Sequence, residues 1–498
     1  MTAVRAKASA AERGPGDDWR RLHPATPFLR SWGALVALVA VGLYNLHNRL
    51  GDLMAAARAL GWHRVGLGTL VLLTLAFAYA WVWWRRAYFQ IGEVKLEVVT
   101  GVLFRRRRTV RLDRIEAVDT VRPLIPRLSG LVKLKIETAG GSGSAVELAY
   151  LKMSDAAHWR QVVLTRAAAA KQVKQTESAT HPAAPKSTET QFGEFLGDCD
   201  ADAPELFAVP TKRVIASLAV SAWVLLTVLL AAGAVTALVL RKTGVAAAMA
   251  PGILTFGSIT WKRLISDFGF SAKQTERGLT LSHGLTTRVS QTITPGRILA
   301  VQAYQGPIWR RFGWWRAKMN VAGYGSKDSE AQSVLVPVGD LETIRRAIWA
   351  VAPALAQMDR WELITAAMTR SGPTAGFTGA PRRARLLDPL AWKRTAFAVT
   401  PEALILRKGA LLRSATLVAH GRLQGLEMTQ GPWSRRRDLA AATFHTPDGP
   451  VTAHINHLAA TEALALIKDE SDRLNQSMAA AQTSRPQPDI LRNRQAPQ

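Results

Sequence analysis

Cysteine is almost absent from this sequence, because Cys199 is the only one among 498 residues. A lone cysteine excludes an intrachain disulfide framework and a cysteine-rich metal site, and it agrees with a reducing compartment. Acidic residues are also scarce: 37 Asp and Glu stand against 64 Lys and Arg, so the formal net charge is +27. Charged residues amount to only 20%, whereas hydrophobic residues amount to 48%. This combination indicates membrane segments with basic flanks rather than a soluble basic protein.

The sequence also lacks the short motifs that mark catalytic and nucleotide-binding sites. It has no Walker loop, no His-Glu-x-x-His, no Gly-x-Ser-x-Gly and no Gly-x-Gly-x-x-Gly. His420, His445, His454 and His457 have no thiol or carboxylate at ligand spacing, so we expect surface histidines. These absences argue against an enzyme, a metal site and a bound cofactor.

Four hydrophobic runs are present, and they come in two pairs, at residues 31–46 with 65–84 and 214–240 with 244–261. The second and third runs carry no charge along their whole length, and about 20 apolar residues in a helix match a bilayer core of roughly 30 Å. The first and fourth runs are shorter or interrupted and by themselves could be buried core helices. The pairing favours spanning, because a membrane span followed by the tight connection 241–243 needs a segment that returns the chain.

Basic residues predict the orientation of these spans. Eleven Lys and Arg lie close to the proposed inner ends, against five in the outer connections. This bias places both termini and the long segments between the hairpins in the cytoplasm. The N-terminal segment 1–30 has no apolar core, so we expect no cleavable signal peptide. The expected location is the cytoplasmic membrane, with several crossings.

One pattern repeats three times outside the hydrophobic runs. A glycine precedes an Arg-Ile or Arg-Leu pair at the same spacing in all three copies, and a further arginine follows the pair at that spacing again. These positions, structural or binding, are Gly101, Arg114 and Arg127, then Gly284, Arg297 and Arg310, then Gly409, Arg422 and Arg435. Alternating apolar and polar residues surround each glycine, which predicts short strands, and a helical stretch ends each copy. About 80 residues of this kind predict a small antiparallel barrel or sandwich closed by a helix.

The first copy resembles a known family through four features: the Gly-x-Leu-x-Arg-Arg stretch from Gly101, the turn 112–115, the Pro123 to Arg127 step, and the run 137–141. The family is the bacterial pleckstrin-homology domain of the second type, the membrane-flanked domain of YdbS/YdbT-like multipass membrane proteins. The other two copies keep mainly the glycine, Arg-Ile/Leu and arginine positions. The resemblance extends over most of the chain. It implies a non-enzymatic membrane protein, often accompanied by a smaller single-domain relative.

The expected fold class is an α+β membrane protein with two transmembrane helical hairpins and three small antiparallel β-barrel or sandwich domains, PH-like and each closed by a helix. The predicted order is a cytoplasmic N-terminal segment (1–30), transmembrane hairpin 1 (31–84), PH-like domain 1 (85–170), a flexible linker (171–205), transmembrane hairpin 2 (206–261), PH-like domain 2 (262–357), a linker (358–390), PH-like domain 3 (391–475) and a disordered tail (476–498).

The densest basic cluster is the candidate lipid-headgroup site: Arg105, Arg106, Arg107, Arg108 and Arg111. In a strand, alternate members would face opposite sides. The cluster follows the second hydrophobic run closely, and a basic residue near an anionic membrane surface contributes roughly 1 kcal/mol. Contact with anionic phospholipids is one interpretation, and a solvated face or a positive-inside anchor is the other. Nucleic acid is not expected, because no stacking aromatics alternate with the basic residues.

Apolar residues precede the last arginine of each repeat, at 124–125, 308–309 and 433. Such a loop could rest in the headgroup layer or pack in the barrel, and both readings remain open. The resulting functional hypothesis is a membrane scaffold or sensor that binds protein partners and anionic lipid headgroups. The alternative is an accessory subunit of a membrane transport or export system, although the spans hold no charged residue for an ion or proton path.

Overall fold

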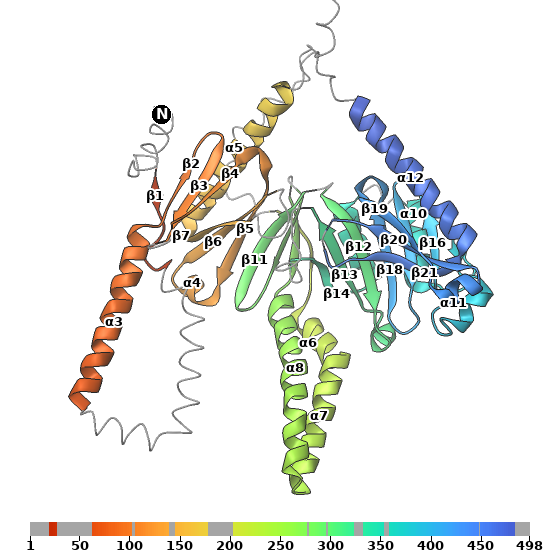
Figure 1. Cartoon of the computed structure of the whole chain (residues 1–498), viewed down its shortest axis with the longest axis horizontal. Coiled ribbons are helices and arrows are strands. Elements are labelled where there is room, and N and C mark those ends of the chain that lie inside the picture. The colour runs from red at the N-terminus through yellow and green to blue at the C-terminus, as the bar shows by residue number, and fades with distance from the viewer. Residues whose placement is uncertain are drawn as a thin grey trace, which may run out of the picture. The chain divides into compact units, whose positions relative to one another are not determined.

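The computed structural model describes residues 19–26, 62–101, 105–138, 145–177, 203–275, 278–294, 297–322, 332–352, 358–447 and 449–483. The chain divides into two compact units, residues 1–138 with 145–174 and residues 139–144 with 175–498. Unit 1 contains the first repeat and unit 2 contains the other two (Figure 1). We call the folded repeats domain 1, domain 2 and domain 3. The predicted hydrophobic run 31–46 and most of the predicted linker 171–205 lie outside the described residues.

Domain 1 is a sandwich of two antiparallel sheets closed by a helix. The first sheet has the strand order β1-β2-β3-β4, and β5, β6 and β7 pair in sequence to form the second. The elements are β1 (Arg20–Arg21), α3 (Trp62–Arg85), β2 (Tyr88–Ile91), β3 (Lys95–Thr100), β4 (Arg106–Arg111), η1 (Leu112–Arg114), β5 (Ile115–Pro123), α4 (Leu124–Leu128), β6 (Leu131–Thr138), β7 (Val146–Lys152) and α5 (Met153–Glu177).

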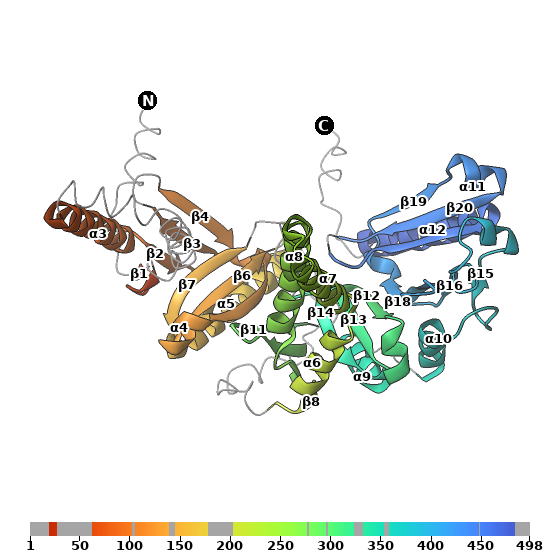
Figure 2. The ribbon, with the colours of Figure 1, turned by 90° about the horizontal axis from the view of Figure 1, so that it is seen from below.

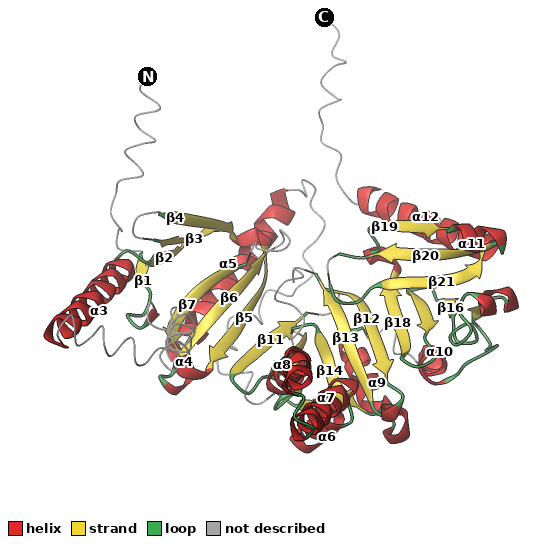
Figure 3. Cartoon of the chain, turned by 60° about the horizontal axis from the view of Figure 1, so that its bottom comes forward, coloured by secondary structure: helices red, strands yellow, loops and turns green. Residues whose placement is uncertain are grey.

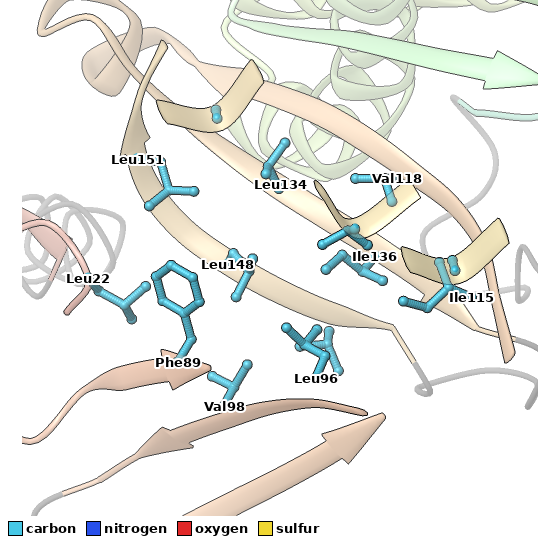
Figure 4. Packing of buried hydrophobic residues seen from close by; sticks show 14 of the residues in the cluster. Leu22, Phe89, Leu96, Val98, Ile115, Val118, Leu134, Ile136, Leu148 and Leu151 are labelled. Atoms are coloured by element: carbon cyan, nitrogen blue, oxygen red, sulfur yellow. The ribbon is translucent and has the colours of Figure 1, made fainter. Parts of the chain in front are cut away.

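The core of domain 1 lies between its two sheets (Figure 4). Alternate residues of β3 and β6 point inward, so that Leu96 and Leu134 are fully buried. Helix α5 covers this core, and its Trp159 meets Phe89 edge to face at 5.6 Å between ring centroids. Successive strand residues point to opposite faces, which is why alternating polarity in the sequence predicted these strands.

Domain 2 has the same order of elements, with strands β8 to β11 in one sheet and β12 to β14 in the other. Asp340 caps its closing helix, because the carboxylate accepts a hydrogen bond from Thr343 N at 2.9 Å. The elements are β8 (Glu205–Ala208), α6 (Thr211–Ala219), α7 (Ala222–Val239), α8 (Thr243–Asp267), β9 (Ser271–Thr275), β10 (Gly278–His283), β11 (Thr287–Ile293), β12 (Ile298–Gln305), η2 (Ile308–Phe312), β13 (Trp315–Val321), β14 (Val334–Gly339) and α9 (Leu341–Val351).

Domain 3 repeats the pattern with sheets β15 to β18 and β19 to β21. Helix α12 lies along the second of these sheets (Figure 2). The elements are α10 (Met358–Thr369), β15 (Thr378–Gly379), η4 (Arg382–Leu386), β16 (Ala396–Val399), β17 (Ala403–Lys408), β18 (Arg413–Ala419), η5 (His420–Arg422), β19 (Gly425–Thr429), α11 (Pro432–Arg436), β20 (Leu439–His445), β21 (Ala453–Ala459) and α12 (Ala460–Thr483).

The apolar helices are insertions between the first and second strands of a domain. Strands β1 and β2 flank the insertion that contains α3, and β8 and β9 flank α6 to α8; each pair of strands is antiparallel. In domain 3 the segment 380–395 occupies this place, between β15 and β16. The predicted domain starts at residues 85, 262 and 391 therefore each leave out the first strand.

Helices α7 and α8 are the two in the described part of the chain that are long and apolar enough to cross a membrane. Only 6% of the most apolar stretch of each is buried. Helix α3 also exposes large apolar side chains, among them Leu70, Leu75 and Phe77. The predicted mixture of helices and antiparallel sheets with apolar helices is confirmed at this level. The pairing of α3 with a first span stays a prediction.

The predicted linker at 358–390 is wrong, because most of this stretch is folded. Helix α10 buries Ile364 and Met368, and Ala384 in η4 is also fully buried. The composition of the stretch suggested a linker, but its few apolar side chains pack against domain 3. Likewise α12 continues to Thr483, past the predicted end of domain 3 at residue 475.

Domains 2 and 3 share one sheet. Strand β12 pairs antiparallel with β18 from Ala300 opposite Val418 to Gln305 opposite Arg413. The resulting seven-stranded sheet has the order β14-β13-β12-β18-β17-β16-β15 (Figure 3). Asn320 on β13 adds a second joint: its amide donates to the carbonyl oxygen of residue 451 at 2.7 Å and accepts from the same residue's N–H at 2.8 Å. Domains 2 and 3 are therefore one folded body.

A glycine with positive φ closes the turn after the third strand of every domain. The φ angle is 113° at Gly101, 107° at Gly284 and 83° at Gly409. A Cβ atom on Gly409 would lie 1.9 Å from the carbonyl oxygen of Leu412, so no other residue fits without a backbone shift. The repeated glycines thus fall at one equivalent turn.

We predict that Gly409→Ala destabilises the protein by roughly 2 kcal/mol or more, because a left-handed Ala costs about 1–2 kcal/mol before any steric overlap. Gly421→Ala is the matched control, since its Cβ would meet nothing within 4 Å. Thermal unfolding of the full-length variants in detergent measures the difference. Equal midpoints for the two variants would contradict the assignment of this turn.

Candidate functional site

The apolar helices leave domains 1 and 2 at the same end of the sandwich, which we call the helix end. In domain 1, α3 ends at Arg85 and β2 begins at Tyr88, opposite Val99 near the end of β3. In domain 2, the N–H of Gly284 donates to the carbonyl oxygen of Phe268 at 2.8 Å, just after α8. The turn between the third and fourth strands therefore lies beside the base of the helices in both domains.

Four of the five arginines of the predicted cluster lie on β4, the edge strand of the first sheet, and Arg105 directly precedes this strand. The cluster extends away from the helix end. Arg106 pairs with Thr100, and Arg111 pairs with Lys95 near the opposite end. At about 3.4 Å per residue, Arg106 and Arg111 are about 17 Å apart. All five arginine side chains are exposed, but only Arg105 and Arg106 lie at the base of α3.

Two of the five arginines are held by carboxylates of the same domain. Arg107 Nε donates to Glu97 at 3.0 Å, and Arg111 donates to Asp113 through two nitrogens at 3.0 and 3.1 Å. Burial alone would raise the pKa of Glu97, but hydrogen bonds from Lys95 and Arg107 outweigh burial, and the pKa lies below its usual value. The charges of Arg107 and Arg111 are therefore balanced by carboxylates within domain 1.

The other three arginines differ from one another. Arg108 donates to the carbonyl oxygen of Ala145, just before β7, at 3.0 Å. The side chains of Arg105 and Arg106 make no hydrogen bond or ion pair with any residue that the structure describes. These two side chains remain the candidates for an external anion, and the cluster predicted as one site divides into two parts.

The arginines of the repeat occupy matching places in the three domains. Those before the fifth strand are Arg114, Arg297 and Arg422, and those in the short helix after it are Arg127, Arg310 and Arg435. Arg127 and Arg435 are exposed. Arg310 instead donates to the carbonyl oxygens of Ala410 and Leu411 in the β17–β18 turn, and so it links domain 2 to domain 3. Equivalent positions in the sequence thus have different roles.

A buried ion pair fastens α8 to domain 2. Asp267, the last residue of α8, accepts from Arg316 on β13 at 2.5 and 3.2 Å, and both residues are at most 5% exposed. Arg263, one turn earlier, lies over the ring of Trp309 at 5.4 Å from its centroid. Trp309 Nε1 in turn donates to the carbonyl oxygen of Ser217 on α6 at 3.3 Å. Helices α6 and α8 therefore both contact η2, and α8 is in addition attached to β13.

Sequence reasoning missed two buried arginines in domain 3. Arg394 caps the C-terminus of α10 by donating to Met368 O at 2.8 Å, and Arg407 donates to Gly372 O at the same distance. Burial, together with the positive charges of Arg413 and Arg407, lowers the pKa of Arg394 to about 9. Most partners of Arg394 and Arg407 are backbone carbonyl oxygens, which no sequence pattern reveals.

The prediction of surface histidines is wrong for His420. This side chain is buried, with Nδ1 2.7 Å from Glu470 Oε2 and Nε2 2.7 Å from the carbonyl oxygen of Thr400. These contacts tie α12 to the sheet. His454 is half-buried, 3.1 Å from Lys408 Nζ. Among the described residues, no group of three or more His, Cys, Asp or Glu could hold a metal ion.

A cavity of about 420 Å³ lies in domain 1, beside the β2–β3 turn. Arg20, Glu93 and Arg166 line it with mixed charge, and Arg166 already donates to Gly92 O at 3.1 Å. It opens near the end of the sandwich opposite the helix end. No feature of its lining favours one ligand class.

Three sandwiches of this kind, two of them with apolar helices inserted between the first two strands, define a protein built on PH-like domains. The chain belongs to the bacterial PH domain family, which matches residues 34–167, 212–351 and 364–478, more than three quarters of the sequence. The predicted family is thereby confirmed.

The sequence is also 29% identical over 105 residues to the UPF0699 transmembrane protein YdbT of Bacillus subtilis (strain 168). The aligned part is 21% of this chain and 21% of that relative. The chain therefore matches about a fifth of the relative's length.

We predict that Asp267→Asn costs about 3–5 kcal/mol of stability, because it leaves the Arg316 guanidinium buried without a counter-charge. The double variant Asp267→Asn/Arg316→Met should recover part of the loss, since it removes both charges. Thermal unfolding of the purified full-length proteins compares the three. A single variant as stable as the wild type would show that the pair does not hold α8 to the sheet.

Proposed function

We propose that this chain is a multipass protein of the cytoplasmic membrane whose three PH-like domains act on the cytoplasmic side as a scaffold or sensor for protein partners. The observation that carries the proposal is the position of the apolar helices. The first and second strands of a domain are antiparallel neighbours, so an insertion between them leaves and returns at the same end of the sheet. Such an insertion crosses a membrane an even number of times, and its domain stays on one side.

Charge supports the cytoplasmic side. The connection between α7 and α8 carries Arg241 and Lys242, but more basic residues lie at the opposite ends of the spans. At these ends α6 follows β8 and α8 leads into β9, so domain 2 lies on the side with more basic residues. A smaller single-domain member of the family is the first candidate partner, in accordance with the resemblance found in the sequence.

Anionic lipid contact by Arg105 and Arg106 is part of the same proposal. Both side chains lie at the base of α3 and lack a partner among the described residues. Near an anionic surface each would contribute roughly 1 kcal/mol. Arg107 and Arg111 contribute less, because their charges are already balanced by Glu97 and Asp113.

We predict that Arg105→Ala/Arg106→Ala weakens binding of phosphatidylglycerol to the purified full-length protein by roughly 30-fold, equivalent to about 2 kcal/mol. The control is Arg111→Ala, about 17 Å along the strand, which should change the affinity little. Native mass spectrometry at fixed lipid concentrations measures the bound fraction. A loss of the same size in the control would show a general charge effect instead of a site.

The topology is tested with single cysteines in a Cys199→Ser background. Thr243→Cys, at the connection between α7 and α8, should react with a membrane-impermeant maleimide added to intact cells. Leu464→Cys, 60% exposed on α12, should react only after the cells are permeabilised. Labelling of both positions from the same side would refute the proposed topology.

The scaffold role is tested with a photo-crosslinking residue at position 349 or 464. Trp349 and Leu464 are large exposed apolar side chains on the closing helices of domains 2 and 3. A discrete protein adduct is expected at one or both, whereas the control position 243 should give none. Absence of adducts at both helices would argue against a protein partner on these surfaces.

A further inference from the structure

The place that holds membrane-type helices in domains 1 and 2 holds a short segment in domain 3. Residues 380–395 join β15 to β16, and this stretch is too short for two crossings of about 20 residues each. Domain 3 is nevertheless fixed to domain 2 by the β12–β18 pairing. The matching end of domain 3, where its first and second strands are joined, must therefore lie at a distance from the membrane that domain 2 sets.

Contacts within unit 2 show that the helix ends of domains 2 and 3 face the same way. The hairpin base touches η2, through Arg263 and Ser217 against Trp309. The next residue of η2, Arg310, donates to the β17–β18 turn at Leu411. The segment 380–395 lies at this end as well, because it leads into β16, whose first residue, Ala396, pairs with Arg407 near the end of β17. Helix α11 lies on the same lower side of unit 2 from which α6 to α8 extend (Figure 1).

This end of unit 2 also collects the exposed apolar side chains. Outside α6 to α8 and their connections, unit 2 has ten large hydrophobic side chains that are exposed among its described residues. Two of them lie on the closing helices α9 and α12. The other eight lie in helix-end loops: Leu285, Ile308, Phe312, Leu386, Leu390, Leu411, Leu412 and Trp433. Exposed apolar residues that are scattered singly over a surface need no explanation, but eight of them in loops at one end indicate an interaction site.

The same loops are strongly basic. The stretches 306–314, 380–395, 409–413 and 430–438 contain 11 Lys and Arg, ten of them besides the buried Arg394, but only two acidic residues. Both acids are engaged: Asp388 accepts from Ala391 N at 3.0 Å, and Asp438 pairs with Arg383 at 2.6 Å. A surface of leucine, tryptophan and arginine matches the boundary between acyl chains and anionic headgroups.

The depth of this surface agrees with such a boundary. Trp261 on α8 is 63% exposed, as an interfacial aromatic would be. Arg263 follows it by two positions, about 3 Å along a helix that rises about 1.5 Å per residue. Arg263 lies over the ring of Trp309, which belongs to η2. η2 therefore lies close to the membrane depth of Trp261.

We propose that the helix-end loops of domain 3, together with η2 of domain 2, form a peripheral contact with an anionic bilayer that replaces the missing hairpin of domain 3. This inference rests on the proposed function, because α7 and α8 must span the membrane for the loops to reach it. Leu411 and Leu412, 63% and 66% exposed at the tip of the β17–β18 turn, insert at the acyl boundary. The exposed arginines of the same loops, among them Arg311, Arg382 and Arg436, bind lipid phosphates.

The test uses the full-length Cys199→Ser protein in lipid nanodiscs, with one cysteine carrying a bimane fluorophore. The probes are Leu412→Cys and Leu390→Cys, and the controls are Leu464→Cys and Trp349→Cys. Brominated acyl chains quench a fluorophore that enters the bilayer. We expect brominated phosphatidylglycerol to quench positions 412 and 390 at least about twofold more than 464 and 349, with weaker quenching in phosphatidylcholine.

A further probe, Leu229→Cys on α7, separates this inference from the proposed function. Leu229 is 68% exposed in the middle of the proposed span and should be quenched in either lipid. If 229 is quenched but 412 and 390 match the controls, the peripheral contact is refuted and the spanning hairpin stands. If 229 is not quenched, the proposed function itself fails. Protection of 412 from aqueous iodide without lipid quenching would also refute the contact, because another protein or a second copy would then cover it.

Discussion

The antiparallel pairing of β12 with β18 is the constraint on which the second half of the molecule depends. Backbone N–H and C=O groups at a sheet edge must be paired or exposed to water, so separating the two strands would open two edges at once. The pairing makes domains 2 and 3 one body and gives their loops a common direction. Arg310 and Asn320 can bridge the two domains only because the sheet has already brought them together.

A second constraint is the position of the apolar helices within each domain. An insertion between neighbouring antiparallel strands must begin and end at the same sheet end, and it leaves the sandwich otherwise intact. The buried Asp267–Arg316 pair then fixes the direction of the hairpin relative to the sheet. Domain 3 keeps the sandwich and loses the hairpin, which shows that the helices are an addition to the fold and not part of its core.

The sequence predicted the elements well wherever the signal was local. The apolar runs gave helices α3, α7 and α8, and the threefold glycine marked a turn that only glycine accommodates. The family followed from the same local motifs. The linker at 358–390 failed because Pro, Gly and Arg gave it the composition of a linker, while its few buried side chains pack against strands that lie far along the chain.

The candidate site was predicted only in part. Five arginines were recognised as one cluster, but their partners depend on register: Glu97 faces Arg107 because β3 and β4 pair as they do. His420 and Arg394 were missed altogether, since Glu470 and the carbonyl oxygens of α10 reach them only in the folded chain.

By itself the sequence determined which segments are apolar and that one strand-rich unit with a conserved turn occurs three times, because these properties depend on residues within a few positions of one another. Only the tertiary structure decided that domains 2 and 3 share a sheet and that Arg310 bridges them, while the equivalent Arg127 and Arg435 are exposed. It also decided that exposed apolar side chains from five loops lie at one end of unit 2. The physical reason is that strand pairing, burial of charge and loop clustering join residues from about 25 to more than 100 positions apart, and no local pattern encodes that choice.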